Sequence, residues 1–314
     1  MKNQSVKSRS MREAFGDALV ELGKENERLV VLDADVSSST QSRRFAVAFP
    51  ERFFNVGVAE ANMADVAAGL ATAGFRPVIS AFSIFLALKS TDQIRNVICY
   101  NNLPVVVAGG YGGLSDSFDG ASHHSIADLA IMRAFPNMTV VVPGDGGEVR
   151  DALREAVRID GPVFIRLSRN PTPLLFDEAE PLRMGRIRTM RVGTDVTIAV
   201  TGVPCSFAAE AADLLRAEGT SVELLEVSTL KPLDTERLAA SVRKTARLLT
   251  VEEHSVIGGL GSACAEALAR LCPTRMEMIG IEDRFTESGP YDTLLEKYGI
   301  SVDHIVRRAR TLIG

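Results

Sequence analysis

The chain has 314 residues, enough for about two domains that each bury a core. Its 46% hydrophobic and 24% charged residues are typical of globular proteins and exclude a mainly disordered or fibrous chain. The 40 acidic and 35 basic residues include no basic block that could offset a phosphate backbone, so we expect no nucleic-acid partner.

The first half alternates short β-branched runs with helical patterns, which is typical of β-α-β units on a mainly parallel sheet. Strands are predicted at residues 30–34, 77–81, 104–108, 139–142 and 162–167. Helices are predicted at residues 12–24, 60–73, 85–100, 126–135 and 148–159.

Residues 170–191 break this alternation with three prolines and no clear period, so we predict a linker at 171–190. The alternation then resumes, with strands predicted at 196–201, 222–227, 247–251 and 278–281. Helices are predicted at 205–218, 235–244, 261–272 and 302–311. We therefore expect two three-layer α/β domains with predominantly parallel sheets, at residues 1–170 and 191–314.

The sequence contains no apolar run of about 18 residues and no signal peptide at its start, so we expect a cytoplasmic protein that does not enter a membrane. Its four cysteines form no C-x-x-C pair, and each lies in an apolar segment. This pattern predicts reduced, buried thiols rather than disulfides or a zinc site.

Two glycine motifs resemble cofactor-binding motifs only in part. Residues 259–261 (Gly-Leu-Gly) begin a partial dinucleotide fingerprint, but its sixth position is Cys264, so we do not expect bound NAD. Residues 144–146 (Gly-Asp-Gly) look like the start of a metal and diphosphate site, with Asn170 as a second ligand. A strand-to-helix turn with Glu148 in the first helical turn explains this motif better, so we predict no metal ligands on this chain.

Glu60 is a lone carboxylate in an apolar run that leads into a helix rich in alanine and glycine. Such a carboxylate is suited to hold or share a proton. An ordinary glutamate at a helix N-terminus, with no role in chemistry, would show the same sequence pattern. The loop at 118–125 adds an acid, Asp119, and the neighbouring His123 and His124. Loops at strand ends are where α/β proteins place ligands, so this loop predicts a binding site.

These two segments, together with Val-Glu-Glu-His-Ser-Val-Ile-Gly-Gly-Leu-Gly at 251–261, resemble the C-terminal part of transketolase. The resemblance covers nearly the whole chain, as a pyrimidine-binding domain followed by the transketolase C-terminal domain. It implies thiamine diphosphate as cofactor, with Mg²⁺ held by an N-terminal partner subunit that carries the diphosphate-binding domain. The chain is similar to the second subunit of a split, two-gene transketolase, and we also expect it to pair with a second copy of itself.

The resemblance assigns cofactor contacts by position. Glu60 matches the catalytic glutamate that bonds the aminopyrimidine ring, where the cofactor supplies the carbanion chemistry and the protein places the proton. Phe82 and Phe85 match the aromatic residues that hold this ring, although two core phenylalanines would show the same spacing. Asp35 matches a residue near the cofactor, and its alternative is a polar residue that ends a strand.

The resemblance also assigns substrate contacts. His123 matches the catalytic histidine of the family's Asp-Gly-x-Thr-His-Gln loop, and Asp119 matches the acid that contacts a donor sugar hydroxyl. Arg169 matches the arginine on the substrate phosphate, which suits its planar, two-pronged donor group. Ser39 and Arg9 match the helpers of this arginine more loosely.

The chain departs from the family pattern at the substrate end. The loop before Asp119 lacks the usual histidine, and Tyr111 is the nearest substitute. His124, which we count among the expected substrate-binding residues, replaces the family glutamine. A histidine there also resembles the β subunits of 2-oxo acid dehydrogenases, although the Asp-Gly-x-Ser-His spacing favours transketolase.

We therefore expect the transfer of a two-carbon ketol unit between sugar phosphates or close analogues. One alternative is a β subunit of a 2-oxo acid dehydrogenase, and another is a non-catalytic subunit that shapes an assembly. The joint presence of Glu60, Asp119, His123 and Arg169 argues against the last alternative, because a scaffold has no use for all four.

Overall fold

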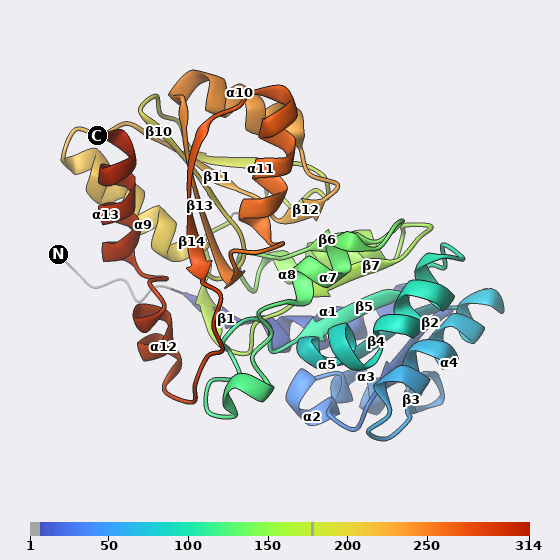
Figure 1. Ribbon diagram of the computed structural model, residues 1–314. Coiled ribbons are helices and arrows are strands. Elements are labelled where there is room, and N and C mark those ends of the chain that lie inside the picture. The colour runs from blue at the N-terminus through green and yellow to red at the C-terminus, as the bar shows by residue number, and fades with distance from the viewer. Residues whose placement is uncertain (1–6, 177–178) are drawn as a thin grey trace.

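Two mainly parallel sheets organise the chain, and helices cover both faces of each (Figure 1). The computed structural model describes residues 7–176 and 179–314. The expected fold class, two α/β domains with mostly parallel sheets, is confirmed.

The first sheet has seven strands in the order β12-β6-β7-β5-β4-β2-β3. All neighbours pair in parallel except β12, which runs antiparallel to β6 at one edge. The strands are β2 (Leu29–Asp33), β3 (Phe53–Asn55), β4 (Arg76–Phe82), β5 (Val106–Gly110), β6 (Thr139–Val141), β7 (Val163–Arg166) and β12 (Thr229–Lys231).

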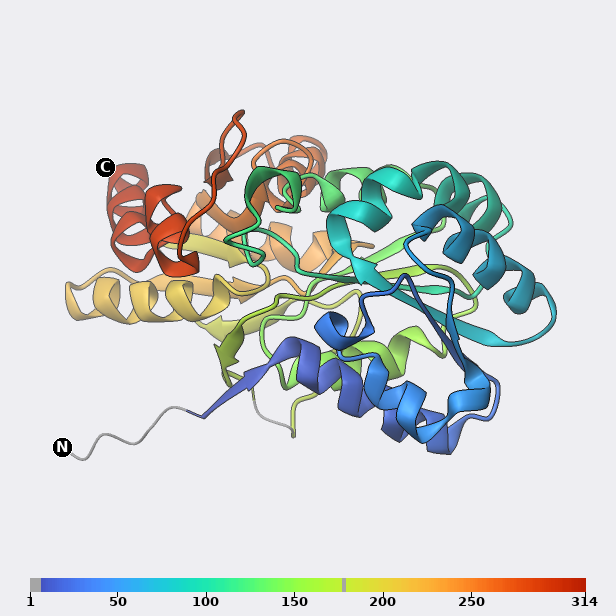
Figure 2. The ribbon, with the colours of Figure 1, turned by 90° about the horizontal axis from the view of Figure 1, so that it is seen from below.

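Alternating strand residues face two layers of helices. Val31 packs toward α1 and α8 with Phe15, whereas Val30 and Leu32 pack toward α4 with Met63. Figure 2 shows the strands between these two layers. The helices of this domain are α1 (Met11–Glu25), α2 (Ser37–Thr40), α3 (Arg43–Ala48), α4 (Glu60–Thr72), α5 (Ser83–Lys89), α6 (Thr91–Gln93), α7 (Asp128–Ala134) and α8 (Glu148–Ala156), with the short turns η1 (Pro50–Arg52), η2 (Ile94–Cys99) and η3 (Gly120–Ser122).

The second sheet has five strands in the order β14-β13-β10-β11-β9, of which only the edge strand β9 is antiparallel. Its strands are β9 (Arg188–Arg191), β10 (Val196–Val200), β11 (Val222–Glu226), β13 (Arg247–Ser255) and β14 (Arg275–Ile281). Its helices are α9 (Cys205–Ala217), α10 (Thr235–Thr245), α11 (Leu260–Leu271), α12 (Tyr291–Lys297) and α13 (Val302–Ile313).

One apolar core joins the two domains. It runs from Met63 and Leu86 of the first domain to Leu238 of α10 and Leu260 of α11. The edge strand β12, which follows β11 in sequence, completes the first sheet rather than the second. A two-stranded ribbon of β1 (Ser8–Ser10) and β8 (Pro171–Pro173) lies apart from both sheets.

The structure differs from the sequence prediction mainly at short elements. The single helix predicted at 85–100 is broken into α5, α6 and the π-helical turn η2. The segment predicted as a linker contains β8 and most of β9. Among the described residues, no helix has the length and apolar character needed to cross a membrane. Cys99, Cys205 and Cys264 are free and buried as predicted, and Cys272 is free but half-buried.

Candidate functional site

The expected site residues cluster along the carboxyl edge of the seven-stranded sheet. Glu60 follows β3, Phe82 ends β4, Tyr111 follows β5 and Arg169 follows β7. Parallel strands bring their carboxyl ends to one edge, which is the usual ligand position in α/β sheets. The fold therefore gathers residues that lie more than a hundred positions apart in the sequence.

Glu60 begins α4 and is only 5% exposed. Its Oε1 and Oε2 atoms lie 3.2 and 3.4 Å from Nζ of Lys89, a half-exposed lysine at the end of α5. The same Nζ lies 4.4 Å from the centre of the Phe85 ring. Glu60 is thus a buried carboxylate with a cation and an aromatic ring beside it.

Phe82, Phe85, Tyr111 and His123 form an aromatic cluster next to Glu60. The rings of Phe82 and Phe85 lie 5.7 Å apart at an angle of 26°, and the Tyr111 ring stacks on Phe82 at 4.3 Å. His123 meets Phe85 edge-on at 5.2 Å. Ring faces of this kind, together with the Glu60 carboxylate, could hold a flat heterocycle that carries a hydrogen-bond donor.

Asp116, Asp119 and His123 come together in the loop after β5. Each offers a ligand atom, and these atoms lie within 4.8 Å of one another, so this group could hold a cation as well as a hydroxylated ligand. Asp116 is only 1% exposed, whereas Asp119 is exposed. Burial raises the pKa of Asp116 to about 6, and the neighbouring charge of Asp119 adds to this effect.

Arg169 reaches this loop from the end of β7. Its guanidinium lies 3.2 Å from Asp116 Oδ1 and 5.3 Å from the centre of the Tyr111 ring. Arg12 contacts the same tyrosine from α1, donating to the Tyr111 hydroxyl at 3.2 Å and to the Ser39 carbonyl at 3.3 Å. Arg12 therefore links Ser39 to Tyr111, and Arg169 lies over the ring of the same tyrosine.

Of the three remaining expected residues, Arg9 and Asp35 have no contact with this cluster among the described residues, whereas His124 lies beside it, against the backbone of Asp116. Arg9 lies on β1 and pairs with Asp17, and Asp35 is exposed and accepts a hydrogen bond from Asn55. His124 is 1% exposed, and its Nδ1 lies 2.7 Å from the Thr286 hydroxyl of the second domain. Their expected ligand contacts stay predictions.

Sequence reasoning missed Asp116, Arg12 and Lys89. Asp116 lies three positions before Asp119, but its pairing with Arg169 joins residues 53 positions apart. Nothing in a single sequence indicates that pairing. Tyr111 could be noticed only as the residue where a family histidine is missing.

A second charged group is buried between the domains. Arg166 of β7 donates to Asp128 Oδ2 at 2.8 Å and to the Glu253 carbonyl at 2.8 Å. Glu253 of β13 accepts from the Leu114 amide at 2.6 Å and from the Tyr291 hydroxyl at 2.9 Å. This interdomain network therefore fixes the start of the loop that carries Asp116.

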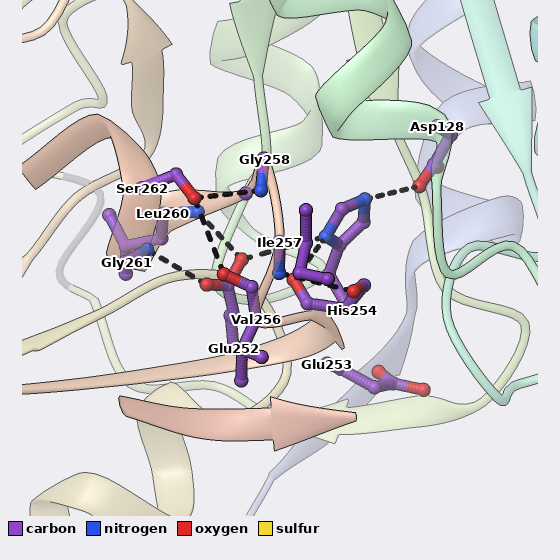
Figure 3. Close-up of polar contacts among 12 residues, drawn as sticks. Asp128, Glu252, Glu253, His254, Val256, Ile257, Gly258, Leu260, Gly261 and Ser262 are labelled. Atoms are coloured by element: carbon purple, nitrogen blue, oxygen red, sulfur yellow. Dashed lines mark hydrogen bonds and ion pairs between the residues drawn. The ribbon is translucent and has the colours of Figure 1, made fainter. Parts of the chain in front are cut away.

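His254 and Glu252 extend the interdomain network (Figure 3). His254 Nε2 lies 3.7 Å from Asp128, and Glu252 accepts from the Leu260 and Gly261 amides at 2.6 and 2.8 Å. Burial raises the pKa of Glu252 to about 7 and lowers that of His254 to about 4. Glu252 thus occupies the N-terminus of α11, the position at which a dinucleotide would place its pyrophosphate.

The Gly-Asp-Gly turn at 144–146 is structural. Asp145 accepts hydrogen bonds from the Gly147 amide at 2.7 Å and the Leu175 amide at 2.7 Å. Glu148 accepts from the Gly144 amide at 2.8 Å. Both carboxylates are therefore used to hold the start of α8 and the segment after β8.

Family models match most of the chain. The transketolase pyrimidine-binding domain matches residues 7–173, and the transketolase C-terminal domain matches residues 185–305. The chain is 42% identical to a putative transketolase C-terminal section of Methanocaldococcus jannaschii, over 96% of this chain and 95% of that protein. It is 40% identical to the 6-deoxy-6-sulfo-D-fructose transketolase subunit SqwH of Clostridium sp., over 95% of this chain and 93% of that protein.

A further relative and a solved structure are also similar to this chain. A 1-deoxy-D-xylulose-5-phosphate synthase of Heliobacterium modesticaldum is 37% identical over 96% of this chain, which spans 46% of that enzyme. Among solved structures, a split-gene transketolase described as an inactive β4 tetramer superposes with a TM-score of 0.91 at 46% identity, covering 97% of this chain and 98% of that chain. The chain therefore belongs to the transketolase family, with a pyrimidine-binding domain followed by a transketolase C-terminal domain.

Proposed function

We propose that this chain is the pyrimidine-binding subunit of a two-chain transketolase that moves a two-carbon ketol unit between sugar phosphates or close analogues. The observation that carries the proposal is the single row of side chains along one sheet edge. Glu60, the Phe82 and Phe85 rings, His123 with Asp119, and Arg169 follow one another there.

The residues at Glu60 fit the aminopyrimidine end of thiamine diphosphate, the cofactor of this family. A buried carboxylate can accept a hydrogen bond from a ring nitrogen, and the Phe82 and Phe85 rings offer apolar contact for a flat heterocycle. When bound, the cofactor supplies the carbon nucleophile that ketol transfer requires.

The chain's own residues then place protons and hydroxyls. Glu60 holds the proton that it shares with the ring nitrogen, and Lys89 balances its charge while the carboxylate is ionised. Asp119 accepts from a donor hydroxyl, and His123, packed edge-on against Phe85, exchanges a proton with the substrate oxygen nearest the reacting carbon.

The diphosphate and its Mg²⁺ need ligands that we assign to an N-terminal partner subunit. The relative described as an inactive β4 tetramer supports both parts of the proposal, because that protein assembles with itself and is inactive in that form. We therefore place the working site between this chain and its partner, with copies of this chain also paired.

Ketol transfer by the reconstituted pair of subunits tests the proposal. With thiamine diphosphate and Mg²⁺, the pair should move a two-carbon unit from a ketose to an aldose, and Glu60→Gln should lower the rate by about a thousandfold or more. Glu266→Gln makes the same change at an exposed residue that pairs with Arg133, so its rate should match wild type. Oxidative decarboxylation of a 2-oxo acid without ketol transfer would instead support the dehydrogenase alternative.

A further inference from the structure

Two arginines reach the Tyr111 side chain from different elements. Arg169 follows β7, and its guanidinium carbon lies 5.3 Å from the centre of the Tyr111 ring. Arg12 lies in the first turn of α1, and its Nη1 atom donates to the Tyr111 hydroxyl at 3.2 Å and to the Ser39 carbonyl at 3.3 Å. Tyr111 is therefore in contact with two positively charged groups.

The two arginines differ in their partners. Arg169 pairs with Asp116 at 3.2 Å, and the Asp116 side chain is only 2% exposed. Arg12 forms no ion pair with a carboxylate among the described residues, and its Nε atom is buried there without a hydrogen-bond partner. Asp116 thus offsets much of the charge of Arg169, whereas the charge of Arg12 is left for another partner.

The hydrogen bond from Arg12 also determines what the Tyr111 hydroxyl can do. Because the hydroxyl oxygen accepts from Arg12, its single hydrogen is left to donate to an acceptor. Tyr111 has a backbone φ of +59°, which is uncommon for residues other than glycine, and its ring stacks on Phe82 at 4.3 Å. Such a conformation persists only where the surroundings hold it, so the hydroxyl is fixed beside the Arg12 guanidinium.

The segments that carry the two arginines also contain buried donors without partners. Ser10 Oγ, two positions before Arg12, and Asn170 Nδ2, directly after Arg169, have no hydrogen-bond partner in the described part of the chain. Ser10 lies opposite Pro171 in the β1–β8 ribbon, so these two segments are neighbours. Donors that lack acceptors in the protein suit a ligand that brings only acceptors, as a phosphate dianion does.

We propose that Arg12, together with the Tyr111 hydroxyl that it holds, is a specificity-determining residue for the terminal phosphate of the donor sugar. The resemblance to transketolases assigns no role to Arg12, and Tyr111 stands where the family's loop histidine is missing. Arg12 supplies at this position the cation that a tyrosine cannot. The proposal rests on the proposed ketol transfer and names a residue that selects a phosphorylated donor over an uncharged one.

D-fructose 6-phosphate and D-fructose, used as donors by the complex with its partner subunit, test this proposal. Arg12→Gln should lower the phosphate-to-fructose ratio of kcat/KM by at least about tenfold, because the phosphate loses a charged donor. The change should raise KM for the phosphorylated donor and leave kcat nearly unaltered. Comparing the ratio between proteins cancels intrinsic differences between the two donors.

Two further variants sharpen this comparison. Arg150→Gln makes the same change at an exposed pair with Glu21 and should leave the ratio unaltered. Tyr111→Phe keeps the ring and removes the hydroxyl, so it should lower the ratio by a smaller factor, about threefold. Arg12→Met replaces Arg12→Gln if that variant does not fold. Equal losses on both donors, or an unaltered ratio in a folded Arg12 or Tyr111 variant, would overturn the proposal.

A binding measurement separates this proposal from the proposed function. Inorganic phosphate, titrated calorimetrically into the full chain, should bind Arg12→Gln at least about tenfold more weakly than wild type, whether or not the complex turns over. Absence of ketol transfer from both donors would contradict the proposed function alone. Equal phosphate affinity in the two proteins would contradict the role of Arg12 alone.

Discussion

Two groups of charged residues lie close together in this fold and differ in the exposure of their cations, which is 6% for the Arg166 side chain and 39–50% for those of Arg169 and Lys89. In the interdomain network, Arg166 and Glu253 are buried, and each bonds to several protein groups. At the sheet edge, Glu60 has only a half-exposed lysine as partner, and Asp116 keeps one oxygen free among the described residues.

The comparison shows that a perturbed pKa alone does not locate the site. The pKa of Glu253 is raised to about 7 and that of His254 is lowered to about 4, both because of burial, yet these residues connect two domains. Partly exposed charged side chains at the carboxyl edge of a sheet point to a ligand more directly. The interdomain network should therefore control stability, and the sheet edge should control chemistry.

Replacing Arg166 should give the largest loss of stability. Arg166→Met removes the partner of a fully buried carboxylate, Asp128, so we expect a loss of about 3–5 kcal/mol in the free energy of unfolding. Urea denaturation measures this loss. Arg150→Met, at an exposed pair with Glu21, is the control and should change stability by less than about 1 kcal/mol. Equal small losses of stability in Arg166→Met and Arg150→Met would contradict the role of the interdomain network in stability.

Glu253 should make the stability depend on pH. The pKa of Glu253 in the folded chain is about 7, above the ordinary value of 4.5. Between these two pH values the folded chain therefore binds more protons than the unfolded chain, and the stability that this proton provides is lost as the pH rises through 7. Glu253→Gln should therefore lose less stability than wild type between pH 5 and pH 8, by roughly 3 kcal/mol.

Denaturation at several pH values checks this difference. His254 acts in the opposite direction, because its lowered pKa lets stability rise with pH between about 4 and 6.5. Comparing Glu253→Gln with wild type at each pH cancels that contribution. Parallel pH profiles for the two proteins would show that Glu253 is not a titrating part of the interdomain network.

Tyr291→Phe should have a smaller effect. It removes the hydroxyl that donates to Glu253 at 2.9 Å, and we expect a loss of about 1–2 kcal/mol in the free energy of unfolding. Tyr100→Phe changes a tyrosine that is 83% exposed and should leave stability unaltered. Thermal denaturation distinguishes the two, and an unchanged midpoint for Tyr291→Phe would contradict its place in the interdomain network.

Lys89→Met should have the smallest effect on stability. Lys89 is half-exposed, so its ion pair with Glu60 is screened by solvent. Loss of this pair should lower the free energy of unfolding by less than about 1 kcal/mol. Ketol transfer by the reconstituted complex should change much more than stability does, because Lys89 lies against the carboxylate that we assign to the cofactor. A large drop in stability with unaltered kinetics would assign Lys89 to the fold.

The sequence predicted the strands and helices of the two domains better than the contacts between their side chains. The continuous apolar run that includes Val30, Val31 and Leu32 correctly predicted a strand, and the loop that carries His123 was correctly placed after a strand. Short elements such as β8 and β12 were missed because three residues show no periodicity. The pairs Asp116–Arg169 and Glu253–Tyr291 depend on how distant segments pack, which a single sequence does not show.

Calorimetric titration of thiamine diphosphate with Mg²⁺ tests the central claim, that Glu60 lies in one half of a two-chain site. The isolated chain should show no binding in the micromolar range, the complex with its N-terminal partner should bind, and Glu60→Gln should weaken binding to that complex. Micromolar binding by the lone chain, accompanied by ketol transfer, would contradict the account.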